Sequence, residues 1–182
     1  MGVGADTLST LITLKNSNTT YGASHFTYEL TFYDVNGAPI TSLRRDSFIY
    51  PGQIKRILET GLPIPIASVN RTAVQLAEVE WKPIAEFSLP RIQLRDVRFD
   101  LHPDTRELVA TGLVRNDNPF RISRLTVIAV VSGTARNPLA ASKTFVEDVA
   151  PFEQRFFQVI VPRIDLPAIT PDLVDLFADA QR

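Results

Sequence analysis

The chain has 182 residues, of which 45% are hydrophobic and 21% are charged, as expected for a globular protein with a packed core. A formal net charge of −1 excludes a long-range field that would recruit nucleic acid or an anionic membrane. The lack of cysteine excludes disulfides, thiolate nucleophiles and thiolate metal sites, and two histidines are too few for most histidine-built metal sites or triads.

No apolar run is long enough to cross a membrane, and the first residues lack the basic and apolar regions of a signal peptide. We therefore expect the chain as given to be soluble and not to insert into a membrane.

The hydrophobic pattern is short, alternating and rich in Val, Ile, Thr, Phe and Tyr, which favours β-strands. The segment from Phe26 to Tyr33 alternates apolar and polar residues, which gives one buried and one solvated face. Asn36 and Gly37 follow it and predict a hairpin turn, because both residues tolerate a positive φ. The strands expected in the first half are 8–14, 26–33, 40–49, 53–58 and 73–81.

The second half repeats the first at an offset of one hundred residues. The Asn-x-Asn turn at Asn16 recurs at Asn116, and the proline turn at Pro51 recurs at Pro151. A shared offset for several turns indicates duplication, so we predict an all-β fold of two tandem antiparallel β-sandwiches. The two domains are expected at residues 1–83 and 84–182.

Matching positions in the two halves should supply the two hydrophobic cores. The expected core residues are Leu11, Phe26, Tyr28, Leu30 and Phe48 in the first domain, and Leu113, Leu125, Val127, Ile128 and Phe156 in the second.

The last segment, residues 169–182, carries conflicting signals. Thr170 and Pro171 are typical of a helix start, with Thr as the cap and Pro at the first helical position. The repeat instead places Val174 and Leu176 on the closing strand of the first half, and we favour a strand.

An alternating strand at Ile92–Leu101 opens the second half, and the repeat places its counterpart before Met1. We therefore expect the first domain to lack its opening strand, and the natural protein to carry an upstream strand and a membrane helix. A missing neighbour leaves unpaired backbone groups, which predicts self-association through that sheet edge. The alternatives are that residues 2–7 cover the edge, or that the missing strand is peripheral.

The segment from Leu30 to Asp34, followed by Asn36 and Gly37, resembles the motif of the FxLYD family of small bacterial β-sandwich domains. Tyr33, Asp34 and Gly37 match the motif, whereas Leu30 replaces its aromatic residue and Phe32 its central leucine; the second half has lost the Tyr-Asp pair. The arrangement is similar to uncharacterised membrane-anchored bacterial cell-envelope proteins with two such domains. The resemblance implies tandem immunoglobulin-like or FxLYD-like sandwiches and an extracytoplasmic, membrane-tethered location, and it implies no reaction.

Three patterns suggest catalysis or metal binding, and each has a simpler interpretation. Asp34 starts a segment like a calcium loop, but no glutamate follows where a bidentate ligand is needed, so we interpret it as a hairpin. The sequence contains no nucleophile elbow that could accompany His25 in a triad, so we interpret His25 as a surface residue. Acidic residues in alternating strands are interpreted as a solvated face: Glu78, Glu80, Glu86, Asp96 and Asp100. We expect no catalytic residue, cofactor or metal ligand.

Two further patterns are interpreted as ordinary surface chemistry. Asn18 and Asn70 begin matches to the N-glycosylation acceptor pattern, which we assign to loops. An arginine stripe is assigned to solvated strand faces rather than to nucleic-acid binding, because the chain is not basic: Arg91, Arg95 and Arg98, with Arg44, Arg45, Lys55 and Arg56.

Trp81 is the only tryptophan and stands at the end of the first domain. We predict that it packs between the domains together with Arg91, and the alternative is a small-ligand site in the crease beside them.

These patterns predict a non-enzymatic, extracytoplasmic module that acts as a structural spacer or a protein-interaction unit with protein partners. The alternative is a carbohydrate-binding or hydrolytic envelope protein that uses exposed aromatics such as Tyr21, Tyr50 and Phe152.

Overall fold

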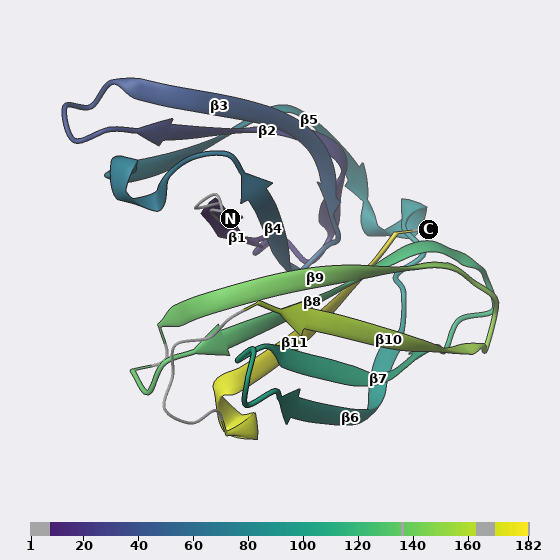
Figure 1. The fold of residues 1–182 in the computed structure, drawn as a ribbon. Coiled ribbons are helices and arrows are strands. Elements are labelled where there is room, and N and C mark those ends of the chain that lie inside the picture. Colours follow the sequence, from purple (N-terminus) through teal and green to yellow (C-terminus); the bar gives the residue numbers. More distant parts are fainter. Residues whose placement is uncertain (1–7, 136, 163–169, 182) are drawn as a thin grey trace. The chain divides into compact units, whose positions relative to one another are not determined.

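The computed structural model describes residues 8–135, 137–162 and 170–181, which fold almost entirely into antiparallel β-strands (Figure 1). This confirms the predicted all-β class. The chain divides into two compact units, Met1–Leu89 and Pro90–Arg182, and each is described by itself.

The segment that follows Pro83 is tied to the first unit. The Ile84 N–H donates to the Thr20 carbonyl at 2.7 Å. The Phe87 ring packs edge-on against Tyr50, with 5.7 Å between the ring centroids.

The first unit contains two antiparallel sheets. One has the order β3-β2-β5 and the other pairs β1 with β4. The elements are β1 (Leu8–Lys15), β2 (Tyr21–Tyr33), β3 (Pro39–Ile49), β4 (Ile54–Leu62), the 3-10 turn η1 (Ile66–Ser68), β5 (Arg71–Pro83) and the 3-10 turn η2 (Ile84–Glu86).

The second unit also contains two antiparallel sheets, with the orders β9-β8-β11 and β10-β7-β6. The elements are β6 (Ile92–Leu101), β7 (Leu108–Asn116), β8 (Ile122–Ser132), β9 (Pro138–Val149), β10 (Gln154–Val161), the 3-10 turn η3 (Pro171–Leu173) and β11 (Val174–Gln181).

The two units share strand order and most of their register. The order β3-β2-β5 corresponds to β9-β8-β11, and the pair β1-β4 corresponds to β7-β10. Leu14 lies opposite Lys55, and one hundred residues later Val114 lies opposite Arg155. This agreement supports the duplication.

The offset falls by one residue within β8. The first hairpin is closed by the Asp34 N–H on the Ala38 carbonyl, and its equivalent by the Gly133 N–H on the Asn137 carbonyl. The cause is a bulge in β2, where the register against β3 shifts between Ala23 and Phe26. Equivalent residues of the two hairpins are therefore ninety-nine rather than one hundred positions apart, as Asp34 and Gly133 show.

The core of the first unit draws side chains from both of its sheets. Alternate residues of β2 are buried, and they meet Ile12 of β1 and the half-buried Ile57 of β4. Three expected core residues are confirmed, whereas Leu11 and Phe48 are half-buried. The buried β2 residues are Phe26, Tyr28, Leu30 and Phe32.

The core of the second unit likewise takes side chains from both sheets, including Val127 of β8 and Val159 of β10. The expected Leu125, Val127 and Ile128 are buried. The prediction for Phe156 is wrong, because that ring is 62% exposed and its neighbour Phe157 is 2% exposed. Leu113, which lies opposite Phe156, is only half-buried.

The favoured strand at the end of the chain is confirmed, since Val174–Gln181 forms β11 and pairs with β8. The helix-start signal at Thr170 produces only the short turn η3, closed by the Leu173 N–H on the Thr170 carbonyl at 2.9 Å. Residue 169 lies outside the described range.

Strand β6 has no counterpart among the described residues of the first unit. In the second unit β7 pairs with both β10 and β6, whereas β1 pairs with β4 alone among residues 8–89. Residues 2–7, the expected alternative cover for this edge, lie outside the described residues.

No helix in the described part of the chain is long and apolar enough to cross a membrane.

Candidate functional site

A network of polar side chains lies on the face of the β3-β2-β5 sheet that points away from the core. Nε2 of His25 lies 3.3 Å from the Asp46 carboxylate. The Thr27 hydroxyl, which is buried, lies 3.1 Å from the Asp46 carboxylate and 3.0 Å from that of Glu78. The structure thus brings His25 and an aspartate together.

This network does not form a catalytic triad. A triad requires a hydroxyl that donates to the imidazole, which then accepts its proton. The neighbouring Ser24 hydroxyl instead lies 3.0 Å from the Glu80 carboxylate, and the Thr27 hydroxyl also faces carboxylates. Both hydroxyls hold the strands together by bonds to side chains across the sheet.

The electrostatics of Glu78 also disfavour general acid catalysis. The Arg44 guanidinium donates a hydrogen bond to this carboxylate and lowers its pKa, and the Thr27 hydroxyl lowers the pKa further. A general acid at neutral pH needs a raised pKa. Glu78 therefore stays ionised and serves as a partner for Arg44.

Other acidic residues from the sequence analysis lie on separate elements. Glu86 is in η2, where its carboxylate lies 4.0 Å from the Lys82 ammonium, and Asp96 and Asp100 are in β6. Within residues 8–135, 137–162 and 170–181, no three His, Asp or Glu side chains gather closely enough to hold a metal ion.

The Asp34 carboxylate closes a hairpin. It accepts the backbone N–H groups of Asn36 and Ala38, each at 2.8 Å, and Gly37 takes the positive φ of 81° that the turn requires. The five-residue loop is longer than the two-residue turn that the Asn-Gly pair predicts.

Each Asn-x-Asn turn is a hydrogen-bonded corner that ties strand ends together. The buried Asn16 amide donates to the carbonyls of Tyr21 and Tyr50, and its oxygen accepts the Asn18 N–H. The Asn16 N–H donates to the Gln53 carbonyl at 2.9 Å, and the Gln53 side chain accepts the Tyr50 N–H.

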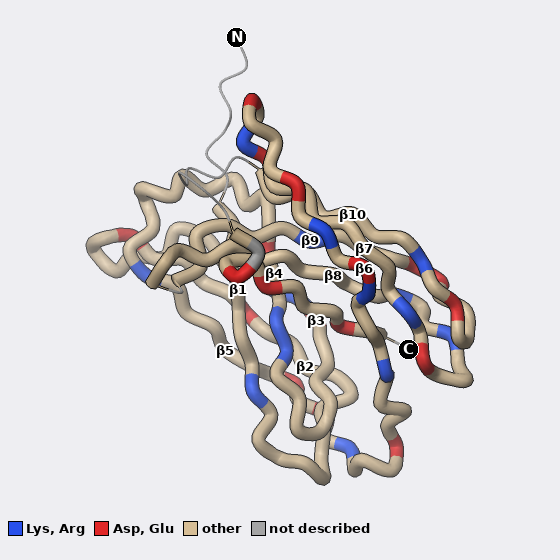
Figure 2. Tube along the Cα trace, turned by 90° about the horizontal axis from the view of Figure 1, so that it is seen from below, with Lys and Arg blue, Asp and Glu red and all other residues tan. Residues whose placement is uncertain are grey.

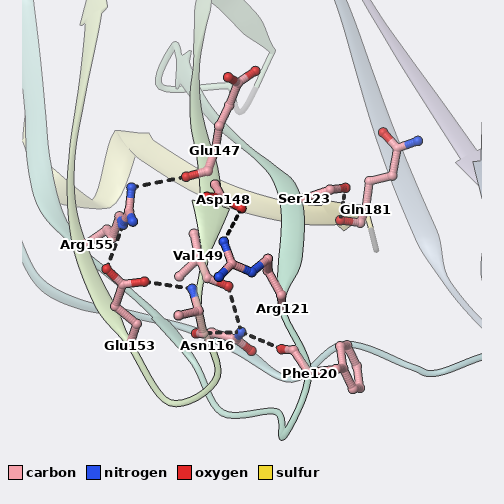
Figure 3. Close-up of polar contacts among 11 residues, drawn as sticks. Asn116, Phe120, Arg121, Ser123, Glu147, Asp148, Val149, Glu153, Arg155 and Gln181 are labelled. Atoms are coloured by element: carbon pink, nitrogen blue, oxygen red, sulfur yellow. Dashed lines mark hydrogen bonds and ion pairs between the residues drawn. The ribbon is translucent and has the colours of Figure 1, made fainter.

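The second unit repeats this corner, as Figure 3 shows for Asn116. The Asn116 amide donates to the carbonyls of Phe120 and Val149 and also to that of Ala150 at 3.0 Å. Glu153 takes the place of Gln53, because its carboxylate accepts the Ala150 N–H at 2.6 Å. Asn16 and Asn116 are therefore structural corner residues in both halves.

Ion pairs surround the second corner (Figure 3). Arg121 binds Asp148, and the Arg155 guanidinium donates to Glu153 at 2.8 Å. These guanidinium groups lower the pKa values of Asp148 and Glu153, and the Ala150 N–H lowers that of Glu153 further. The charges are paired on the surface and hold neighbouring strands.

The basic residues do not form a single-sign surface. Figure 2 shows acidic and basic residues interspersed along the strands of both units. The Arg95 guanidinium bonds Gln93, and the Arg44 guanidinium pairs with Glu78. The arginine stripe is thus divided among local contacts.

Trp81 and Arg91 occupy defined places within their own units. Trp81 lies in β5 opposite Ala23 and is 56% exposed, while the backbone of Arg91 exchanges hydrogen bonds with the Asn118 side chain. The contact between the domains at these two residues stays a prediction.

The aromatics of the alternative carbohydrate-binding interpretation differ in exposure. Tyr21 and Phe152 are exposed, in the first and second unit respectively. Tyr50 is half-buried between Phe48 and Phe87, with ring centroids 5.2 and 5.7 Å away.

A cavity of about 350 Å³ opens between the start of β3 and the end of β4. No charged side chain lines it, and its walls are mainly apolar. It therefore lacks the convergent polar groups that orient a specific ligand. Its apolar lining comes from Phe32, Ile40, Leu43, Leu62, Pro63 and Ile64.

The sequence analysis missed an uncovered apolar surface on β5. Val74 and Leu76 lie opposite the buried Leu30 and Tyr28, so they belong to the core-facing side of the sheet. They are nevertheless 40% and 47% exposed. The alternation of residues 73–81 predicts the strand, but only the three-dimensional arrangement shows that nothing among the described residues of this unit covers its inner side.

No family model matches this sequence, and no curated protein matches it.

Proposed function

We propose that the chain is a non-enzymatic module of two tandem β-sandwich domains, immunoglobulin-like or FxLYD-like, which acts as a structural spacer or a protein-interaction unit. In the natural protein the module is extracytoplasmic and is tethered to the membrane of a bacterial cell envelope.

The shared architecture of the two units carries this proposal. Each unit has a core between two antiparallel sheets, and the strand orders correspond from one unit to the next. Two sheets that enclose one core are the arrangement of a β-sandwich.

The use of the polar side chains supports a non-enzymatic role. Ser24, His25 and Asp46 bond across neighbouring strands, and the asparagine corners hold loop carbonyls. Among the described residues, every buried side-chain nitrogen or oxygen has a hydrogen-bond partner. Polar groups reserved for a substrate are more often left without a protein partner.

The resemblance to the FxLYD motif supports the assignment to that kind of domain and to the envelope. The matching residues lie in or beside the first hairpin. The Asp34 carboxylate accepts two backbone N–H groups of the turn, and Gly37 has the positive φ. The Tyr33 ring makes a cation–π contact with the Arg71 guanidinium.

An activity and stability panel tests the proposal. We expect glycosidase, esterase and phosphatase substrates to remain at background rates, and a chelator to leave the unfolding temperature unchanged. A chelator-induced fall would reveal a bound metal and contradict the proposal. Glycan binding that is lost in Tyr21→Ala but kept in Phe152→Ala would favour the carbohydrate-binding alternative.

A further inference from the structure

Strand β6 forms one edge of the β10-β7-β6 sheet in the second unit. It runs antiparallel to β7, with Leu94 opposite Val114 and Phe99 opposite Ala110. Its inward side chains, Ile92, Leu94 and Phe99, pack against the core of the unit. Strand β6 thus satisfies the backbone edge of β7 and covers the core from one side.

The equivalent place in the first unit is open among its described residues. Strand β1 corresponds to β7 and pairs only with β4. On the facing sheet, β5 corresponds to β11, whose Val174 is 7% exposed and whose Leu176 packs against the core. The residues of β5 that face the first core, Val74 and Leu76, are 40% and 47% exposed.

A backbone edge and an apolar floor therefore bound one position that no described residue of the first unit fills. We call it the strand slot: the β1 edge together with Val74 and Leu76. Two independent features point to one ligand shape. A strand added to the β1 edge would satisfy its backbone groups, and apolar side chains at alternate positions would cover the floor.

The charges beside the strand slot define the ligand further. Lys15 is exposed on the outer face of β1, Arg56 lies opposite Thr13 on the same face, and β1 contains no acidic residue. In the second unit the residues of β6 opposite the equivalents of Lys15 and Thr13 are Gln93 and Arg95. Opposite charges on facing or diagonal residues stabilise a strand pair. An acidic residue therefore suits the position that faces Lys15, and an acidic rather than a basic residue suits the position that faces Thr13, because Lys15 is its diagonal neighbour.

We propose that the strand slot binds an extended segment of a partner protein, antiparallel to β1. The segment is apolar at the positions of Ile92, Leu94 and Phe99, and acidic at those of Gln93 and Arg95. This inference deepens the interaction role of the proposed function. It is tested by binding to the purified chain, so it can fail while the activity panel still gives background rates.

The probe is a synthetic peptide of residues 92–101 that carries Gln93→Glu and Arg95→Glu. We expect it to bind the full chain saturably and to slow hydrogen exchange at alternate amides of β1. The unmodified 92–101 peptide should bind more weakly, because its Arg95 would face the neutral Thr13 and lie diagonal to Lys15, with no acidic partner in β1. A peptide that also carries Leu94→Asp and Phe99→Asp should not bind, because carboxylates would then lie on the apolar floor.

Matched variants of β5 locate the binding. Val74→Lys combined with Leu76→Lys should weaken binding by about tenfold or more, because two ammonium groups would replace the apolar floor. Gln75→Lys adds one such charge on the opposite face of β5, opposite Glu29, and should leave binding within about twofold. All three substituted side chains are exposed, so the fold should survive, as circular dichroism would confirm.

A further variant of the chain carries the added strand covalently linked to β1, which removes the entropic penalty of association. In this variant, residues 92–107 with Gln93→Glu and Arg95→Glu are joined directly before Leu8. We expect the unfolding temperature to rise and β1 to gain protection. If the linked strand has neither effect, or if peptide binding is insensitive to Val74→Lys with Leu76→Lys, the proposal is overturned. Self-association of the chain that protects β1 and is lost in the same β5 variant would also overturn it, because a second copy would then occupy the strand slot.

Discussion

Gly112 lies on the inner face of β7, directly beneath the ring of Phe157. A Cβ atom at this position would lie 2.8 Å from the Phe157 ring and 2.9 Å from the Arg95 carbonyl oxygen. The first contact crosses the β7–β10 pair and the second the β7–β6 pair, so the glycine allows both neighbours to approach. The absence of a side chain is therefore a packing requirement here.

Gly112→Ala should destabilise the second unit by about 1–3 kcal/mol, because the added methyl group overpacks a well-filled core. Chemical denaturation measures the loss. The control is Ala178→Ser, at an exposed position of β11, which should cost less than about 1 kcal/mol. Equal stability of Gly112→Ala and the wild-type chain would show that the ring of Phe157 does not lie as described.

Glu153 and Gln53 perform the same task in the two corners with different charge. Each side chain accepts the N–H of the residue three positions earlier, and only Glu153 also binds an arginine, Arg155. That guanidinium lowers the pKa of Glu153 below its ordinary value. A lowered folded-state pKa contributes stability above the unfolded-state pKa, and this stability is lost as the pH falls through the folded-state pKa.

Glu153→Gln should therefore lower the unfolding temperature of the second unit at pH 7, where the carboxylate is ionised. The difference from the wild-type chain should shrink as the pH falls below about 4, because the protonated carboxyl then resembles the amide. Thermal unfolding followed from pH 7 to pH 3 measures this difference. A difference that stays constant over this range would mean that the Arg155 ion pair contributes nothing to stability.

At the scale of elements, β10 shows that a shift of one residue along a strand decides whether a side chain lies in the core or on the surface. Two adjacent phenylalanines, Phe156 and Phe157, make the sequence pattern compatible with either face. The register settles the choice, since Phe157 lies opposite Gly112 and Phe156 opposite Leu113. The space above Gly112 accepts the inward ring.

Phe157→Ala should destabilise the second unit by about 3–5 kcal/mol, because it leaves a cavity in the core. Phe156→Ala, the same substitution one residue earlier, should cost less than about 1 kcal/mol, because that ring is exposed. The two denaturation midpoints provide the comparison. Similar losses for both variants would show that β10 presents both rings to the core.

Much of the strand pattern could be predicted from alternation, as β2 and β6 show, because each has one face packed and one face solvated. The residues around the bulge in β2 could not, because an inserted residue changes the offset without altering the composition of the strand. At the chain end, Thr170 and Pro171 give a helix-start signal, but pairing of β11 with β8 limits it to a single turn.

The polar sites could also be predicted from the sequence only in part. The Asn-x-Asn pattern indicates a turn at Asn16, but the carbonyls that it reaches, such as that of Tyr50, are distant in sequence and could not be predicted. The exposure of Val74 was also hidden, because a strand sequence does not show which face of the opposite sheet is incomplete.

At the scale of the whole molecule, the described residues of the two units share one order of strands and differ by a strand. Within residues 8–135, 137–162 and 170–181, five strands of one unit correspond to five of the other, β1 to β5 and β7 to β11, and β6 is additional. The exposure of the two outer strands agrees with this difference: Leu176 of β11 packs against its core, whereas no described residue of the first unit covers Val74.

Residue-resolved hydrogen exchange of the full chain tests this account most directly, by comparing the amides of β1 with those of β7. Strand β7 is paired on both sides, so all of its amides should be protected, whereas in β1 only the alternate amides that face β4 should be. Fast exchange at alternate residues between Leu8 and Lys15, beside uniform protection between Leu108 and Asn116, is the predicted result. Uniform protection of β1 would contradict the account, because the open edge would then be covered in solution.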